Sequence, residues 1–476
     1  MRSSKSKLAF VIIAIGLLTI SSDIIAQSLN SQVDVLFAEW DLETSPGCAL
    51  GVVKDGELVY AKGYGSADLE HNIPITPSTV FYIASVSKQF VTMSVLLLEE
   101  QGKINLDDEI QVYLPDFPRY DSPLTIRHFI HHTSGVRDYL TLWALAGNDY
   151  LDYVDKDAVY RLIKRQKTLN FTPGERYLYS NSCYFMLAMI VEKASGESIR
   201  EFARKNIFEP LEMNDSHFHD NNLHIVKNRA FSYSPAGEDS PNDDFDNLIM
   251  RFDLVGSGGV YSTINDLYKW DQNFYRNKLG KGGPEIINKM HEDGVLNNGK
   301  SANYAFALHN DTYRGLKTVS HGGSLAGYRT QHIRFPEQDF SVILLGNISS
   351  FRSASMAKKV ANVYLADVLQ PFTEEAPKAI LVSSDEEKEF SIANLSQYAG
   401  IYYSEELDVV YKLSEEKGSL LLSVKDNNPL KLTSTELDTF FYEYIALVFD
   451  REDNNAISGF KVNAGRVQNL AFEKIK

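Results

Sequence analysis

The most constraining feature of the sequence is a long apolar helix that begins with a serine and a lysine. Residues Ser85 to Glu100 have the apolar content and spacing of a buried helix, and Gly102 ends the pattern. Because Ser85 and Lys88 are three residues apart, their side chains lie one turn apart on the same helix face. The sequence therefore predicts a lysine held out of water beside a serine.

This pair of side chains is suited to nucleophilic chemistry. A serine hydroxyl becomes a nucleophile when a base takes its proton, and a partly desolvated lysine can be that base. The unpaired N–H groups at the start of a helix also favour a developing oxyanion. The Ser-x-x-Lys spacing alone is weak evidence, because it recurs at Ser4/Lys7, Ser355/Lys358, Ser414/Lys417 and Ser458/Lys461. Of these pairs, only the one at Ser85 begins a strongly apolar helix.

Two further motifs contain residue types that such a site needs. Tyr179-Ser180-Asn181 follows a Thr-Pro-Gly-Glu turn and precedes an apolar helix, and His321-Gly322-Gly323-Ser324 enters a strand. A tyrosine hydroxyl can move a proton, and an asparagine amide can bind a substrate carbonyl. Two glycines on a strand let a substrate backbone approach closely. Either motif alone is commonplace, so the evidence lies in the three motifs together.

With these motifs in this order, the chain resembles the serine β-lactamase and penicillin-binding superfamily. It is most similar to the branch related to class C β-lactamases, D-Ala-D-Ala carboxypeptidases, D-aminopeptidases and bacterial esterases. The resemblance extends from about Val33 to Leu369 and implies an α+β fold, with an antiparallel sheet flanked by helices. The supporting stretches are FYIASVSKQF at 81–90, IRHFIHHTSG at 126–135, FTPGERYLYSN at 171–181 and GSGGVYST at 256–263.

The resemblance also implies a role for each matching residue. Ser85 would be the acylated nucleophile, Lys88 its base, and Tyr179 the proton shuttle for acylation and deacylation. No cofactor and no metal would be required. The remaining implied contacts are Asn181, His321 and Gly323 with the substrate, and the backbone N–H groups of Ser85 and Ser324 with the oxyanion.

One position departs from the family pattern. His321 and Gly322 lie where lactamases have the lysine and threonine of a Lys-Thr-Gly strand. Lysine supplies a permanent cation and threonine a hydroxyl, whereas here the cation depends on pH and the hydroxyl is missing. The departure favours a peptidase or esterase of the same fold. The predicted protein is an exported serine hydrolase that cleaves small amides or esters, with D-amino-acid peptides or esters as the expected substrates. Two alternatives remain, a true class C-type β-lactamase and a non-catalytic protein that binds or senses peptidoglycan fragments.

Histidines and cysteines elsewhere suggest structural roles. His128, His131 and His132 are close in sequence, but no carboxylate or cysteine has the spacing of a fellow metal ligand. We expect a structural loop at these histidines. Cys48 and Cys183 are the two cysteines, and we expect two buried free thiols, although export would permit a disulfide.

Changes in composition divide the chain. Residues 1–26 combine a basic start with an apolar run from Leu8 to Ile20, which is typical of a secretory signal and shorter than the about 20 residues of a bilayer span. Residues 27–370 are expected to form the hydrolase domain, and residues 371–395 an acidic, proline-containing linker. Residues 396–476 alternate apolar and polar side chains, which predicts a small all-β, barrel-like domain. We expect a periplasmic or secreted protein with no stable membrane span after signal removal.

The charge balance limits the partners. The chain has 63 acidic residues against 47 lysines and arginines, a formal net charge of −16. Binding along nucleic acid requires clustered lysine and arginine, so no nucleic-acid partner is expected. The expected partner is a small-molecule or peptide substrate. The sequence leaves the exact substrate and the oligomeric state open.

Overall fold

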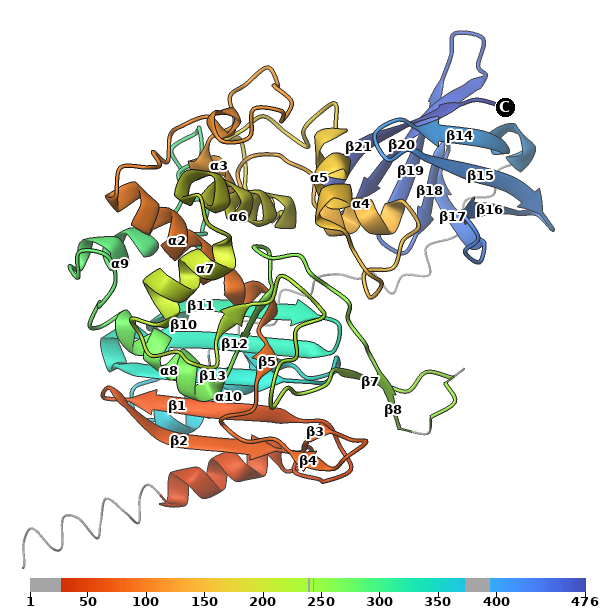
Figure 1. Cartoon of the computed structure of the whole chain (residues 1–476). Helices are drawn as coiled ribbons and strands as arrows, with labels where there is room; N and C mark the ends of the chain where they lie inside the picture. The colour runs from red at the N-terminus through yellow and green to blue at the C-terminus, as the bar shows by residue number, and fades with distance from the viewer. Residues whose placement is uncertain (1–26, 239, 243, 373–393) are drawn as a thin grey trace, which may run out of the picture.

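The structure is a computed structural model that describes residues 27–238, 240–242, 244–372 and 394–476 (Figure 1). The predicted signal at 1–26 and most of the predicted linker at 371–395 lie outside the described residues. One antiparallel sheet flanked by helices precedes a closed barrel, which confirms the predicted fold class. Within the described residues, no helix is both long and apolar enough to cross a membrane.

The central sheet joins strands from both ends of the first domain. Its order is β10-β11-β12-β13-β1-β2, and all neighbouring strands are antiparallel. The turn between β1 and β2 places Asp55 at φ 53° and Gly56 at φ 80°, a hairpin conformation that these residue types tolerate well. The strands are β1 (Cys48–Lys54), β2 (Glu57–Tyr64), β10 (His309–Tyr313), β11 (Leu316–Leu325), β12 (Tyr328–Phe335) and β13 (Phe340–Gly346).

Side chains of the sheet alternate between two cores, one on each face. Along β1, Ala49 and Val53 belong to one core, and Leu50 and Val52 belong to the other. The first core contains α2 (Lys88–Glu100), α6 (Asn181–Ser195) and α8 (Ile264–Asn273). The second is covered by α10 (Ser353–Tyr364) and a helix over residues 27–37. The sheet is therefore the middle layer of the domain.

The predicted serine helix begins as a single 3-10 turn, η1 (Ala84–Ser87), and continues as α2 (Lys88–Glu100). The helix after the Tyr-Ser-Asn motif is α6 (Asn181–Ser195), which ends where Gly196 takes the left-handed conformation. The other helices are α3 (Ile126–Ile130), α4 (Tyr139–Leu145), α5 (Lys156–Lys164), α7 (Ile199–Ala203), α8 (Ile264–Asn273), α9 (Glu285–Met290) and α10 (Ser353–Tyr364). Short strands are β3 (Ser66–Asp68), β4 (Ile73–Pro74), β5 (Phe81–Tyr82), β6 (His217–Phe218), β7 (Tyr233–Pro235), β8 (Phe245–Asn247) and β9 (Val260–Ser262).

The C-terminal strands form a closed barrel with its own core. Alternate side chains point inward, and the ring of Phe472 lies 4.2 Å from that of Tyr411 and 4.9 Å from that of Phe460. Aromatic rings therefore fill much of the interior. The strands are β14 (Gly400–Ser404), β15 (Val409–Glu416), β16 (Ser419–Val424), β17 (Leu430–Glu436), β18 (Thr439–Tyr442), β19 (Ile445–Arg451), β20 (Ile457–Ala464) and β21 (Val467–Lys474).

The barrel packs against α4 and α5 of the first domain (Figure 1). Leu142, Leu145 and Leu162 from these helices are buried in the same cluster as the barrel core. The Tyr411 hydroxyl donates a hydrogen bond of 2.6 Å to the carbonyl oxygen of Leu145. Apolar burial and a directional bond thus hold the two domains in one arrangement.

Candidate active site

Ser85 lies at a sharp bend between a strand and a helix. β5 ends at Tyr82, and Ala84 then takes φ 48°, a left-handed conformation that is uncommon for a residue with a Cβ. The bend starts η1, so Ser85 lies in the first turn and Lys88 is the first residue of α2. The Lys88 Nζ and Ser85 Oγ are 3.0 Å apart. The structure therefore brings the serine and lysine together as their spacing predicted.

Lys88 is fully buried, and carbonyl oxygens surround its amine. Nζ donates to Asn181 Oδ1 at 3.0 Å and to the backbone carbonyl of Ser257. Loss of water lowers the pKa of Lys88 well below 10.5; the charge of Asp138 opposes this shift, and that of Arg466 adds to it. In the neutral amine, these two carbonyls use both N–H groups, and the lone pair faces the serine hydroxyl. This arrangement suits a base that removes the serine proton.

The Asn181 side chain is held in one orientation by a buried carboxylate. Asp138 Oδ2 accepts hydrogen bonds from the backbone N–H of Asn181 at 2.6 Å and from its Nδ2 at 2.8 Å. The amide oxygen consequently points to Lys88. Asp138 also caps α4, because its Oδ1 accepts from the N–H of Thr141. Asp138 is not among the residues that the motifs predicted for the site, and its place in the sequence signals only a helix cap.

Tyr179 lies beside both Ser85 and Lys88. Its ring centroid is 4.9 Å from Lys88 Nζ, and its hydroxyl is buried without a hydrogen-bond partner among the described residues. Burial raises the pKa of Tyr179 above 10, and the neighbouring Ser85 hydroxyl and Arg466 charge oppose the shift. The phenol is therefore protonated and has a proton available for a bound substrate.

His321 is a neutral residue in this site. Its Nε2 is 3.0 Å from the Tyr304 hydroxyl, and its Nδ1 is 2.6 Å from the carbonyl oxygen of Gly322. The tautomer with hydrogen on Nδ1 satisfies both contacts, since Nε2 then accepts from the phenol. Burial lowers the pKa of His321 to about 3, and the nearby Lys88 charge adds to the effect. His321 therefore supplies no cation near neutral pH, and both ring nitrogens already have partners.

Gly323 lets strand β11 approach the serine turn. A Cβ on this residue would lie 2.5 Å from the carbonyl oxygen of Ile83 and 2.3 Å from Thr330 Oγ1. Any side chain would push the strand away from η1. Ser324, the next residue, lines the same cavity as Ser85, as the predicted oxyanion site requires.

One cavity of about 720 Å³ unites the site residues. It is bounded by η1 on one side and by β11 and β12 on another, and the turn between β20 and β21 of the barrel also reaches it. Lys88 lies behind Ser85, outside the lining. The lining includes Ser85, Tyr179, Asn181, His321, Gly323, Ser324 and, from the barrel, Arg466.

The three histidines of the 126–135 stretch have structural partners. His128 caps α3 together with Thr125. The Nδ1 of His131 lies 3.0 Å from the carbonyl oxygen of Tyr304, and that of His132 accepts from the N–H of Ser180 at 3.1 Å. Burial lowers the pKa of all three. These contacts give the histidines structural partners, but His128 belongs to helix α3 and only His131 and His132 lie in the turn after it.

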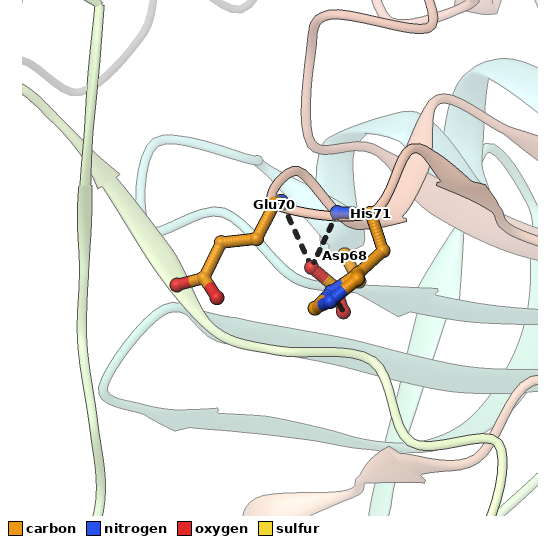
Figure 2. Close-up of side chains that lie close together, drawn as sticks. All are labelled: Asp68, Glu70 and His71. Atoms are coloured by element: carbon orange, nitrogen blue, oxygen red, sulfur yellow. Dashed lines mark hydrogen bonds and ion pairs between the residues drawn. The ribbon is translucent and has the colours of Figure 1, made fainter.

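In the part of the chain that the structure describes, Asp68, Glu70 and His71 form one cluster of potential metal ligands (Figure 2). The Asp68 carboxylate accepts from the backbone N–H groups of Glu70 and His71, and it also contacts the His71 ring at 2.9 Å. These bonds define an exposed turn between β3 and β4, outside the cavity that contains Ser85. We assign no metal site to it.

Both cysteines are buried and free. Cys48 belongs to the core beneath α10, and Cys183 to the core on the other face of the sheet. The sheet separates the two thiols, so a bond between them would require the fold to open.

Ser85 beside a buried lysine and a buried tyrosine, with a glycine strand close to the serine turn, is an arrangement typical of a serine hydrolase. A family model described as Beta-lactamase matches residues 38–365, and the chain belongs to that family.

The chain is similar to a protein named as a penicillin-binding protein and to one named as a D-aminopeptidase. The chain is 28% identical over 409 residues to Penicillin-binding protein 4* of Bacillus subtilis (strain 168), covering 82% of this chain and 87% of that protein. It is 28% identical over 342 residues to a D-aminopeptidase of Gluconobacter oxydans (strain 621H), covering 71% of this chain but 62% of that protein. The solved octameric penicillin-binding protein homologue from Pyrococcus abyssi shares the fold, with a TM-score of 0.63, 23% identity, and coverage of 94% and 99% of the two chains.

Proposed function

We propose that this protein is an exported serine hydrolase that forms an acyl-enzyme on Ser85 and cleaves small amides or esters of D-amino acids, including D-peptides. The observation that carries the proposal is the environment of Lys88, a buried amine whose N–H groups are used by two carbonyls while it contacts Ser85 Oγ at 3.0 Å. The names of the relatives, a penicillin-binding protein and a D-aminopeptidase, support the substrate class.

Acylation follows from the positions of the side chains. The Ser85 oxygen attacks the substrate carbonyl, and its proton passes to the Lys88 amine. The backbone N–H groups of Ser85 and Ser324 stabilise the oxyanion. When the carbonyl re-forms, the bond to the leaving amine or alkoxide breaks, and Tyr179 donates a proton to the leaving atom and regains one from Lys88. Water then attacks the ester while Tyr179 takes a proton from the water and passes its own proton to the neutral Lys88 amine. The bond between the acyl carbon and Ser85 Oγ breaks, and Lys88 returns that proton to the serine oxygen.

The neutral His321 favours this class over an efficient β-lactamase. A β-lactam carboxylate is suited to a permanent cation at the position that His321 occupies, and the low pKa of this histidine removes that cation. Nitrocefin turnover measured beside D-Ala-p-nitroanilide and p-nitrophenyl acetate separates the two activities. Faster turnover of nitrocefin than of both other substrates would overturn the proposed class.

The test of the nucleophile is Ser85→Ala. We expect loss of hydrolysis and loss of covalent labelling by a fluorophosphonate probe. Ser414→Ala is the matched control, because Ser414 begins another Ser-x-x-Lys sequence, in the barrel. Undiminished turnover or labelling in Ser85→Ala would refute the acyl-enzyme, and so would equal losses in the two variants.

Export is a separate part of the proposal. It rests on the basic and apolar pattern of residues 1–26. The intact mass of the protein recovered from the periplasm or medium should correspond to cleavage after Ala26. Recovery of the uncut chain in the cytoplasm alone would contradict export.

A further inference from the structure

The turn between β20 and β21 inserts one arginine of the barrel into the active-site cavity. Arg466 is on this turn, and its carbonyl oxygen accepts a hydrogen bond of 2.9 Å from Asn170 Nδ2. Asn170 Oδ1 in turn accepts from the N–H of Gln468 at 2.8 Å. Asn170 therefore ties the turn to the first domain at Arg466 and at Gln468, which fixes the backbone of the arginine.

The Arg466 side chain lies over the ring of Tyr179 but has few bonding partners. Its guanidinium lies 4.7 Å from the ring centroid of Tyr179, and an Nη atom is 3.8 Å from Asp138 Oδ2. Among the described residues it makes no side-chain hydrogen bond, and 45% of the side chain is exposed. Asp138 already accepts two bonds from Asn181. Most of the five guanidinium N–H donors are therefore free to bind another group.

The charge of the cavity lining is opposite to that of the whole chain. The protein carries a net charge of −16, yet no aspartate or glutamate of the described residues lines the cavity, whereas three arginines do. Arg329 donates to two backbone carbonyls, and Arg352 immediately precedes α10. Arg466 is the arginine beside Tyr179. Such a lining favours an anionic ligand.

We propose that Arg466 binds a carboxylate on the leaving group of the substrate, so that the barrel supplies a specificity residue to the active site. The inference rests on the proposed function, in which Tyr179 protonates the leaving amine. A guanidinium stacked on that tyrosine lies beside the departing residue, whose carboxylate is one carbon away from the amine. A planar guanidinium binds a carboxylate through two parallel hydrogen bonds. The substrate class is therefore a short D-peptide with a free C-terminal carboxylate.

The test compares an acyl-D-Ala-D-Ala peptide with its C-terminal amide. Arg466→Ala should lower kcat/KM for the carboxylate peptide about 10- to 100-fold more than for the amide. Arg466→Lys should restore part of the loss, because it returns the charge without the bidentate geometry. Arg165→Ala is the matched control. Arg165 is 46% exposed and pairs with Asp408 across the same domain interface, outside the cavity.

A second measurement does not depend on turnover. The rate at which a neutral fluorophosphonate labels Ser85 should fall when the carboxylate peptide is present, and fall less with the amide. Arg466→Ala should abolish this difference. Equal protection by both peptides, protection by neither, or a carboxylate preference that survives in Arg466→Ala would overturn the inference.

The outcomes also separate this inference from the proposed function. If Ser85-dependent hydrolysis of p-nitrophenyl acetate persists but carboxylate peptides neither react nor protect, the role of Arg466 is wrong and the hydrolase stands. If no substrate is hydrolysed but carboxylate peptides protect Ser85 through Arg466, the proposed reaction fails and the binding site stands. Equal losses in Arg466→Ala and Arg165→Ala for both peptides would mean that Arg466 acts only through domain docking.

Discussion

Arg137 connects the two domains through a buried ion pair, and its loss should be costly. Its side chain is fully buried, and one Nη atom lies 2.7 Å from Glu406 of the barrel, which is itself 7% exposed. Other guanidinium N–H groups donate to the carbonyl oxygens of Gln468 at 2.9 Å and Asn469 at 3.1 Å. Arg137→Met removes all these bonds while keeping an apolar chain of similar length.

The magnitude follows from burial. Removing one partner of a buried pair leaves the other charge without compensation and typically costs about 3–5 kcal/mol. The same interface contains an exposed pair, Arg165 and Asp408, 3.0 Å apart with side chains 46% and 54% exposed. Solvent screens such a pair, so Arg165→Met should cost about 0.2–1 kcal/mol. Both variants thus remove one arginine charge, and the ion pairs that they break differ in burial.

Urea unfolding followed by circular dichroism measures the difference. Arg137→Met should shift the transition to much lower urea than Arg165→Met does. Arg137→Met/Glu406→Leu should recover part of the loss, because it leaves no buried carboxylate unpaired. Similar small shifts in both single variants would refute the reasoning, and so would a double variant less stable than Arg137→Met.

Three further predictions concern the catalytic site. Lys88→Ala should lower kcat about 10²- to 10⁴-fold. Because burial lowers the pKa of Lys88, the kcat/KM of the wild-type protein should rise with pH along a limb whose apparent pKa lies well below 10.5. A limb at 10.5 would contradict a desolvated base. His321→Asn should leave the shape of the pH profile unchanged between about pH 5 and 8, since the histidine, with a pKa of about 3, is already neutral there. Loss of a limb of the profile in this variant would mean that His321 titrates in that range. Gly323→Ala should lower kcat/KM about 100-fold with an unchanged circular dichroism spectrum, because the added Cβ would lie 2.5 Å from the Ile83 carbonyl oxygen. Full activity in this variant would mean that strand β11 can shift freely.

Much of the fold could be predicted because its signals are local. The Asp55-Gly56 turn determines a hairpin, and the alternation after residue 396 determines strands, since both depend on neighbouring residues. The Ser85–Lys88 contact also follows from helical spacing alone. Closure of the barrel was only suggested by this pattern, because it depends on the pairing of β14 with β21.

Parts of the site could not be predicted, because they depend on contacts between distant segments. Nothing near Asp138 indicates that it orients Asn181, and the neutrality of His321 results from burial against Tyr304 and Lys88. A pKa depends on the three-dimensional surroundings of a group rather than on its neighbours in sequence.

The sequence predicts the pairing of Ser85 with Lys88 and the strand-and-helix pattern, because residues within one helical turn or one hairpin are placed by the backbone geometry of that element. The charges that line the cavity depend instead on how distant segments pack together. The tertiary structure puts Arg466 of the barrel over Tyr179 and leaves His321 without a charge. The physical reason is that burial and distance, which set electrostatic energies, are properties of the packed domains.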